Sequence, residues 1–336
     1  SVAPCEPILC WAPDLSVACG VAQERDRCLN DATAGGRSVF TNERALVTLG
    51  VGKNMVGSIR HWLIVTGMAE ECPGTRGRQL EPSLLGTSIF GERGVGGWDP
   101  YLEDDATLWL LHWQLAGPGS LAFSWVWAFN AFREYEFSKE DMVSSVLAGA
   151  AAHVTKVPAR ATIGRDVECL LRTYVAARDQ MMSDDNLDCP LHSLGLIRSS
   201  FDKHFRFDVG PKETLPDAVF CYALASFWRW HCPEAMTLSL RDIAYEKGSP
   251  GIVFKLDEDA ILDYLDRLAK RPEWGSRFED TAILRQVVRT PHALEDTMTI
   301  LRRTTLGTLA AALAVSLSAL ISVGAQAQTK LRVFSG

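Results

Sequence analysis

The stretch that decides the fold is Thr41–Glu71, with the sequence TNERALVTLGVGKNMVGSIRHWLIVTGMAEE. Its first part predicts a short helix, which Gly50-Val51-Gly52 ends because glycine adopts the positive φ angles of a tight turn. Apolar residues then recur every three or four positions and predict a second helix, which ends at Gly67. Two short helices joined by a glycine-containing turn are typical of a helix-turn-helix, whose second helix can enter the DNA major groove.

The polar face of the second predicted helix carries residue types that contact DNA. Lysine and arginine neutralise phosphates, and asparagine and arginine form bidentate hydrogen bonds with base edges. The alternative is an ordinary helical hairpin with a solvated polar face. A P-loop is excluded, because Val47 and Asn54 stand where that motif needs glycine and Ser or Thr. The predicted DNA contacts are Lys53, Asn54, Ser58, Arg60 and His61.

Composition indicates a globular protein with an acidic body. The 336 residues are 47% hydrophobic and 22% charged, and this length predicts two or three domains. The net charge is −7, although residues 298–336 carry four basic residues and no acid. An acidic body repels the phosphate backbone, so nucleic-acid binding has to come from local basic faces.

Nine cysteines are present, four of them within the first 28 residues. No pair has the Cys-x-x-Cys spacing, which disfavours a zinc ribbon or zinc finger. The other five are expected to be packed free thiols in a reducing cytoplasm. Cys189, with His192 three residues further on, is a candidate nucleophile, and a packed thiol is the preferred interpretation.

The two ends of the chain differ from its middle. Residues 1–36 show no apolar period and are interpreted as an irregular leader, disordered or mis-assigned, with a zinc cluster as the alternative. Residues 298–336 combine a basic start, an uncharged run and Ala325-Gln326-Ala327, which is the layout of a signal peptide. The alternative for this tail is a membrane anchor. We place both ends outside the fold and expect no membrane contact from the folded body.

Carboxylates gather just before a strongly apolar predicted helix. Acidic residues at a helix start are stabilised by the helix dipole, and this structural explanation is sufficient. Carboxylates on a turn can also converge on Mg²⁺, which supplies a nucleophilic water and neutralises a phosphate in phosphodiester cleavage. The candidate catalytic residues for such chemistry are Asp99, Glu103 and Asp104, with Asp99 and Asp104 as metal ligands.

The remaining segments predict a helical body with short strands. Leu84–Phe90 is interpreted as a short strand, in the region where a wing would follow the opening helix pair. Ser138 is expected to cap a helix that has Asp141 at its third position. Thr162–Asp166 precedes a helix that resembles a second small DNA-binding-like unit. Thr237–Arg289 reads as helix, turn, helix and β-hairpin, a winged helix whose second helix is too acidic for a DNA groove.

These patterns predict a mainly α fold with minor β. It is built from helix-turn-helix and winged-helix-like units around a tryptophan-rich helical core. The expected domains are an N-terminal helix-turn-helix-like and Trp-rich domain, a middle helical domain and a C-terminal winged-helix-like domain. Their predicted boundaries are 37–135, 136–236 and 237–297.

Several motifs also carry a family resemblance. They are Leu49–Val56 with Ile59–Trp62, Gly97–Asp104 with Thr107–Trp113, and the shorter Asp188–Leu191, Pro216–Val219 and Ser249–Leu256. Over residues 37–296 the chain resembles a bacterial domain-of-unknown-function family. That family includes the SspB-type component of DNA phosphorothioation systems and is found beside PAPS-reductase-like genes.

The resemblance implies a DNA-acting role in DNA sulfur modification and phage defence, with strand nicking in SspB-type members. It implies double-stranded DNA as a partner, together with sulfurtransferase or PAPS-reductase-like proteins and ATPase proteins of the same system, in the cytoplasm. Two alternatives stay open: a non-catalytic adaptor for the sulfur-transfer complex, and a transcriptional regulator.

Overall fold

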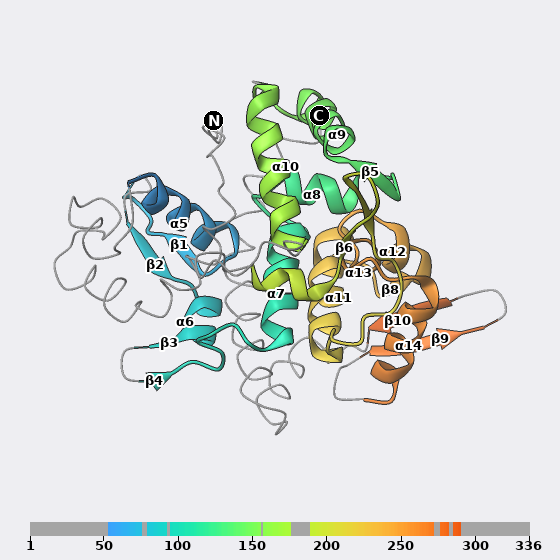
Figure 1. Ribbon diagram of the computed structural model, residues 1–336. Coiled ribbons are helices and arrows are strands. Elements are labelled where there is room, and N and C mark those ends of the chain that lie inside the picture. The colour runs from blue at the N-terminus through green and yellow to red at the C-terminus, as the bar shows by residue number, and fades with distance from the viewer. Residues whose placement is uncertain are drawn as a thin grey trace.

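The computed structural model describes residues 53–75, 79–92, 95–155, 157–175, 189–271, 276–281 and 285–289. The expectations for the leader, for the tail and for the first helix of the opening pair lie outside these residues. Within them the chain is mainly helical, with short antiparallel sheets, as the sequence predicts (Figure 1). None of the described helices combines the length and the apolar character needed to cross a bilayer.

The first described part contains two helices and two small hairpins. Leu84–Phe90, expected to be a strand, forms helix α6 instead, because the Ser83 hydroxyl caps it and accepts from the Gly86 N–H at 2.9 Å. A Cβ at Gly86 would lie 2.1 Å from the Met68 carbonyl oxygen, so glycine allows this close approach. The elements are α5 (Lys53–Val65), β1 (Ala69–Glu71), β2 (Leu80–Pro82), α6 (Leu84–Phe90), β3 (Gly91–Glu92) and β4 (Val95–Gly96).

Helix α7 (Asp105–Ala116) is the buried centre of the molecule and lies between the N-terminal and C-terminal parts in Figure 1. A helix that is apolar on all sides requires cover on all sides. Except for Gln114, every residue from Ala106 to Ala116 is buried, and Trp109 is 0% exposed. Helix α8 (Phe123–Asn130) packs against it and adds Trp125 and Phe129 to the core.

The middle part consists of two long helices and a three-stranded sheet that contacts them. Ser138 and Asp141 form the predicted capping box at the start of α9. Helix α10 starts earlier than expected, so Thr162–Asp166 lies within it, because Ile163 and Val167 continue one buried stripe. The elements are β5 (Glu136–Ser138), α9 (Lys139–His153), α10 (Arg160–Tyr174), the 3₁₀ helix η2 (Pro190–Leu194), β6 (Ile197–Ser199) and β7 (His204–Phe207).

The last part has three short or medium helices after α11, and a second three-stranded sheet. A β-hairpin ends it within Trp274–Arg289, as expected. The first helix expected within Thr237–Arg289 begins at Leu240, since Ser239 is its cap and Thr237–Ser239 is a strand. The elements are α11 (Asp217–His231), β8 (Thr237–Ser239), α12 (Leu240–Tyr245), α13 (Pro250–Phe254), α14 (Glu258–Ala269), β9 (Ser276–Asp280) and β10 (Arg285–Arg289).

The middle and last parts repeat one arrangement. In each, a helix is followed by a strand, further helices and a closing hairpin. The sheet orders are β5-β7-β6 and β8-β10-β9, so the early strand pairs with the last strand of each part, antiparallel in both cases. In each, a Ser-x-x-Asp sequence caps the helix after the early strand, at Ser138 and at Ser239.

Candidate nucleic-acid interface

Helix α5 buries its apolar stripe and leaves a narrow polar edge. Ile59 and Trp62 are 0% and 2% exposed, as the helical spacing predicts. Ser58, a predicted DNA contact, is also buried, with 5% exposure. The helix includes the backbone of Lys53 and Asn54, whose side chains lie outside the structural description.

Arg60 connects α5 to the hairpin that follows. Its guanidinium donates to the Glu71 carboxylate of β1 at 2.7 Å, and the Arg60 side chain is 25% exposed. Burial, and then the neighbouring Arg60 charge, lower the pKa of His61 below its ordinary value. His61 is therefore neutral at pH 7 and can offer a hydrogen bond but no positive charge.

The Asp99 carboxylate organises the turn before α7. Its two oxygens accept the backbone N–H groups of Glu103 at 2.9 Å and Asp104 at 3.1 Å. Asp99 is 6% exposed, whereas Glu103 and Asp104 are exposed. Leu102 adopts a φ of +57° at the tightest point of this turn. The structure thus brings the three candidate carboxylate residues together at one turn.

Asp104 is also the N-cap of α7. Its Oδ1 accepts the Ala106 N–H at 2.8 Å, which satisfies one of the free donors at the helix start. The described residues contain no group of three or more His, Cys, Asp or Glu side chains arranged to hold a metal ion. Because Asp99 and Asp104 are already occupied by backbone donors, the segment is built as a helix start and not as a ready Mg²⁺ cage.

Cys189 lies in the core, with 4% exposure, as expected for a packed thiol. The Nδ1 atom of His192 lies 2.7 Å from the Cys189 backbone carbonyl. The arrangement therefore orients the start of η2.

The outer face of α10 and the β6–β7 hairpin form a second polar region. Arg165 is exposed on α10, and Lys203 is exposed at the turn of the hairpin. Beside Lys203, the Phe201 side chain is 93% exposed. Arg165 falls within Thr162–Asp166 of the second predicted DNA-binding-like unit, whereas no sequence prediction above singles out Phe201 or Lys203. The sequence Phe201-Asp202-Lys203 lies between two short segments in which apolar and polar residues alternate. That pattern is the one sequence feature that indicates a hairpin turn here.

Buried polar groups join the central helix to the middle and last parts. His112 of α7 has its Nδ1 2.7 Å from the Tyr174 hydroxyl and its Nε2 2.9 Å from the Val253 carbonyl. Burial lowers the pKa of His112 to about 3, so the ring is neutral. A neutral ring donates from Nε2 to the carbonyl and accepts from the tyrosine hydroxyl at Nδ1. No sequence pattern assigns His112 a role, because it lies within an apolar run.

Comparisons with known proteins place these features in a family. The family described as "Protein of unknown function (DUF4007)" matches residues 26–304. No curated protein matches the chain. A magnesium-bound SspB crystal structure is 26% identical, with a TM-score of 0.72, over 93% of this chain and 94% of that one. A second SspB crystal structure is 24% identical, with a TM-score of 0.73, over 96% and 94%. These matches confirm the resemblance that the sequence motifs indicate.

Proposed function

This chain belongs to the DUF4007 family, and we propose that it is the DNA-binding component of a DNA phosphorothioation system. The observation that carries the proposal is the repeated order of strand, helices and closing hairpin in the middle and last parts. This order supports a winged-helix interpretation, in which a helix enters the major groove and the hairpin lies beside it. In the first part, helix α5 is also followed by a hairpin, β1–β2.

The similarity to SspB supports the pathway. In the proposed role, the protein acts in the cytoplasm and presents double-stranded DNA to sulfurtransferase or PAPS-reductase-like proteins and to an ATPase of the same system. Phage defence is then the consequence of the modification. The buried core, rich in tryptophan and phenylalanine, gives these DNA-facing helices a rigid support.

Binding of the full chain to a fluorescent duplex, measured by anisotropy at several salt concentrations, tests the DNA role. We expect tighter binding at low salt, with a linear dependence on the logarithm of salt concentration, because phosphate neutralisation releases counterions. Deleting the gene in its host tests the pathway: phosphorothioate linkages should disappear from nuclease-digested genomic DNA in mass spectrometry. A chain that does not bind the duplex, or modification that persists in the deletion strain, contradicts the respective part of the proposal.

A second candidate function is strand nicking, favoured by the magnesium-bound SspB structure to which this chain is similar. Bound Mg²⁺ supplies charge neutralisation and an activated water for phosphodiester cleavage. The described carboxylates do not form a ready cage for it, as shown above, so we assign no chemical step to Asp99, Glu103 or Asp104. Nicking through these residues stays a prediction.

Supercoiled plasmid incubated with the full chain and Mg²⁺ tests it. Asp104→Asn is the most informative variant, because asparagine retains the helix cap but removes the negative charge that a metal prefers. Asp105→Asn, on the next exposed residue, is the matched control. We expect open circles from the wild type and from Asp105→Asn, and fewer from Asp104→Asn. If the wild type and both variants nick the plasmid equally, Asp104 is not part of the catalytic site. If the wild type does not nick it, the result favours the non-catalytic adaptor.

A further inference from the structure

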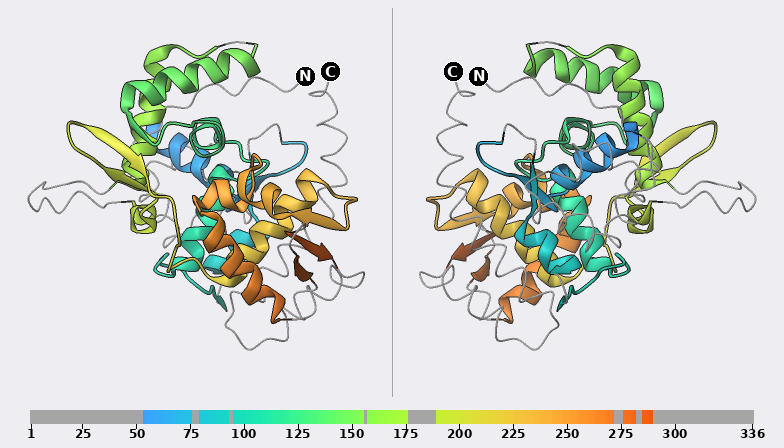
Figure 2. Two further views of the ribbon diagram at one scale, coloured as in Figure 1. Left: turned by 90° about the vertical axis from the view of Figure 1, so that its right-hand side faces the viewer. Right: turned by 90° about the vertical axis from the view of Figure 1, so that its left-hand side faces the viewer.

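We infer that the outer face of α10 and the turn of the β6–β7 hairpin form a duplex-DNA-binding surface distinct from α5. This inference rests on the proposed function and names a second DNA contact for it. In the middle part, α10 is the last α-helix before the hairpin, and α10 and β6 are in contact. The hairpin projects from the body beside α10 (Figure 2). A helix and a neighbouring hairpin in this arrangement can contact the major groove and the adjacent backbone together.

Near the start of α10, its outer face carries small residues and one basic residue. Ala161 is exposed, and a Cβ added at Gly164 would meet no atom within 4 Å. Arg165 is exposed beside them and donates only to the Ala161 carbonyl of its own helix, at 3.3 Å. It makes no ion pair within the described part of the chain. Small side chains let a helix backbone approach the base edges, and an exposed guanidinium suits guanine or phosphate.

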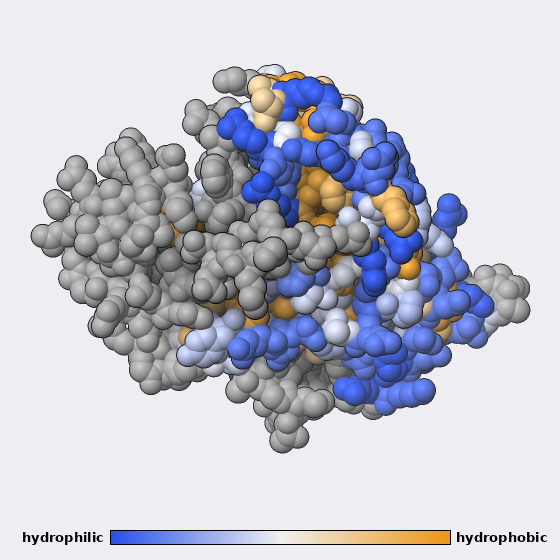
Figure 3. All heavy atoms as spheres, in the orientation of Figure 1, coloured by the Kyte–Doolittle hydropathy of each residue, from blue (hydrophilic) through white to orange (hydrophobic). Residues whose placement is uncertain are grey.

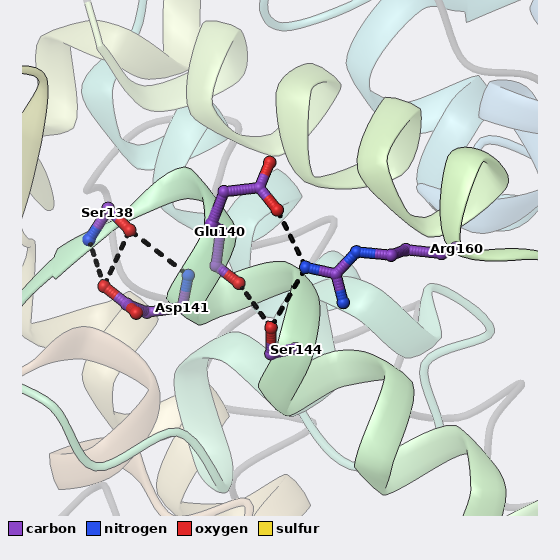
Figure 4. Close-up of polar contacts among 5 residues, drawn as sticks. All are labelled: Ser138, Glu140, Asp141, Ser144 and Arg160. Carbon is purple, nitrogen blue, oxygen red and sulfur yellow. Dashed lines mark hydrogen bonds and ion pairs between the residues drawn. The ribbon is translucent and has the colours of Figure 1, made fainter.

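The first arginine of α10 has a different role. Arg160 reaches across to α9, where it donates to the Glu140 carboxylate at 2.8 Å and to the Ser144 hydroxyl at 3.2 Å (Figure 4). The same end of α9 is held by the capping box of Ser138 and Asp141. Arg160 is therefore a positioning residue that fixes α10 against α9, and its charge is balanced by Glu140.

The hairpin turn supplies an aromatic ring and a cation. Phe201 is 93% exposed, while Phe207 of the following strand packs into the core with 3% exposure. Asp202 and Lys203 have φ angles of +53° and +60°, which make the turn tight and bring the Phe201 ring and the Lys203 ammonium to its end. An apolar wedge next to a cation is the combination that contacts bases and phosphates in the minor groove. In Figure 3 the surface over α10 and the nearby sheet is hydrophilic in most places and is interrupted by hydrophobic patches.

The corresponding helix of the last part has the opposite charge. Asp259, Asp263 and Asp266 are exposed on α14, and its one arginine, Arg267, is paired with Asp217 at 2.8 Å. Such a face repels phosphates. The two repeats therefore differ in charge, and the middle one has the surface that fits duplex DNA.

Anisotropy of a fluorescent duplex with the full chain tests this surface. Arg165→Ala and Lys203→Ala should each weaken binding and reduce the salt slope by about one. Gly164→Gln should weaken binding by about tenfold because it blocks the close approach, whereas Gly164→Ala should have a smaller effect. Phe201→Ser should weaken binding with an unchanged salt slope, since it removes no charge. Lys270→Ala, an exposed cation at the end of α14, is the matched control and should leave binding unchanged.

The outcomes separate this inference from the proposed function. If the wild type binds and the α10 and hairpin variants behave like Lys270→Ala, this surface is not the DNA contact, although the proposed function stands. If the wild type does not bind the duplex, both fail. Every substituted position is at the surface or faces open space, so circular dichroism should be unchanged and no variant should melt at a lower temperature. The two Gly164 variants should melt slightly higher than the wild type, because glycine inside a helix lowers its stability. A lower melting temperature would identify any variant that loses binding through misfolding. The remaining variants would then show whether this surface binds DNA.

Discussion

Lys255 places a cation inside the apolar core. It is 9% exposed, its Nζ donates to the Phe129 carbonyl at 2.8 Å, and it lies 4.2 Å from the centre of the Phe207 ring. No carboxylate pairs with it among the described residues, and burial lowers the pKa of its ammonium to about 7. The backbone at Lys255 has a φ of +56° as the C-cap of α13. The residue thus joins the end of α13 to α8 and β7.

The first prediction follows from this pKa. The unfolded chain has a lysine pKa near 10.5, so between pH 7 and pH 10.5 the unfolded state binds more protons than the folded state. Lys255 therefore makes the free energy of unfolding rise with pH across that window, by at most about 1.4 kcal/mol per pH unit. Lys255→Met should lack this rise and should be the more stable protein at pH 7.

Urea denaturation of both proteins at pH 6.5, 8 and 9.5 measures the effect. The difference in the free energy of unfolding between Lys255→Met and wild type should shrink as pH increases. Because all other titrating groups are present in both proteins, their contributions cancel in this difference. Parallel pH profiles would show that Lys255 keeps an ordinary pKa in the folded protein.

Some of these residue roles can be predicted from the sequence and others cannot. Ser138 and Asp141 are recognisable because the capping box is a local pattern of four residues. Lys255 and His112 are not, because each lies within an apolar run and its partners are more than 60 residues away along the chain. The carboxylates near Asp99 are also predictable as a helix start, since their partners are the next backbone amides.

At the scale of elements, the two Ser-x-x-Asp caps give a matched pair of substitutions. At α9, the Ser138 hydroxyl donates to Asp141 at 2.7 Å, and at α12 the Ser239 hydroxyl donates to Asp242 at the same distance. Ser138→Ala and Ser239→Ala should each lower the thermal midpoint by about 2–4 °C, because each leaves a backbone N–H of the first turn without its cap. Differential scanning calorimetry measures this. If only one substitution lowers the midpoint, the two caps are not equivalent.

Helix α5 carries the third prediction. Lys53→Ala and Arg60→Ala should each weaken duplex binding and lower the salt slope by about one. Glu71→Ala removes the carboxylate that Arg60 contacts at 2.7 Å, so it should strengthen binding if Arg60 acts on DNA. Anisotropy with the full chain provides the measurement. Unchanged affinity in all three variants would mean that Arg60 only anchors the β1–β2 hairpin and that α5 does not face DNA.

Most described helices are predictable from their periodicity, whereas the sheets are not. The buried stripes of α5 and α14 repeat at three- and four-residue spacing, which a sequence displays directly. Strand order depends on partners far apart in the chain, such as β5 and β7, so the repeat of the middle and last parts becomes visible only in the structure. At Leu84–Phe90 a short apolar run was ambiguous, and the cap at Ser83 determined the helix.

At the scale of the whole molecule, Asn130 connects the centre to the last part. It is 5% exposed, and its Nδ2 donates to the Ala116 carbonyl at 2.8 Å and to the Val126 carbonyl at 2.9 Å. Its Oδ1 accepts the Gly248 N–H at 2.7 Å, just before α13. The Lys255 and His112 contacts cross the same region. The two repeats are thus held by buried polar contacts as well as by the shared core.

The last prediction tests whether these contacts couple the two repeats. Asn130→Ala leaves the Gly248 N–H and the Ala116 carbonyl without these partners, which should cost about 1–3 kcal/mol of stability. Because the contacts link both sides, amide hydrogen exchange should speed up in α8 and in α12–α13 together. In Ser138→Ala, by contrast, faster exchange should stay close to the start of α9. Mass spectrometry of peptic fragments measures both. Faster exchange confined to α8 in Asn130→Ala would mean that the repeats open independently and that the apolar core alone holds them side by side.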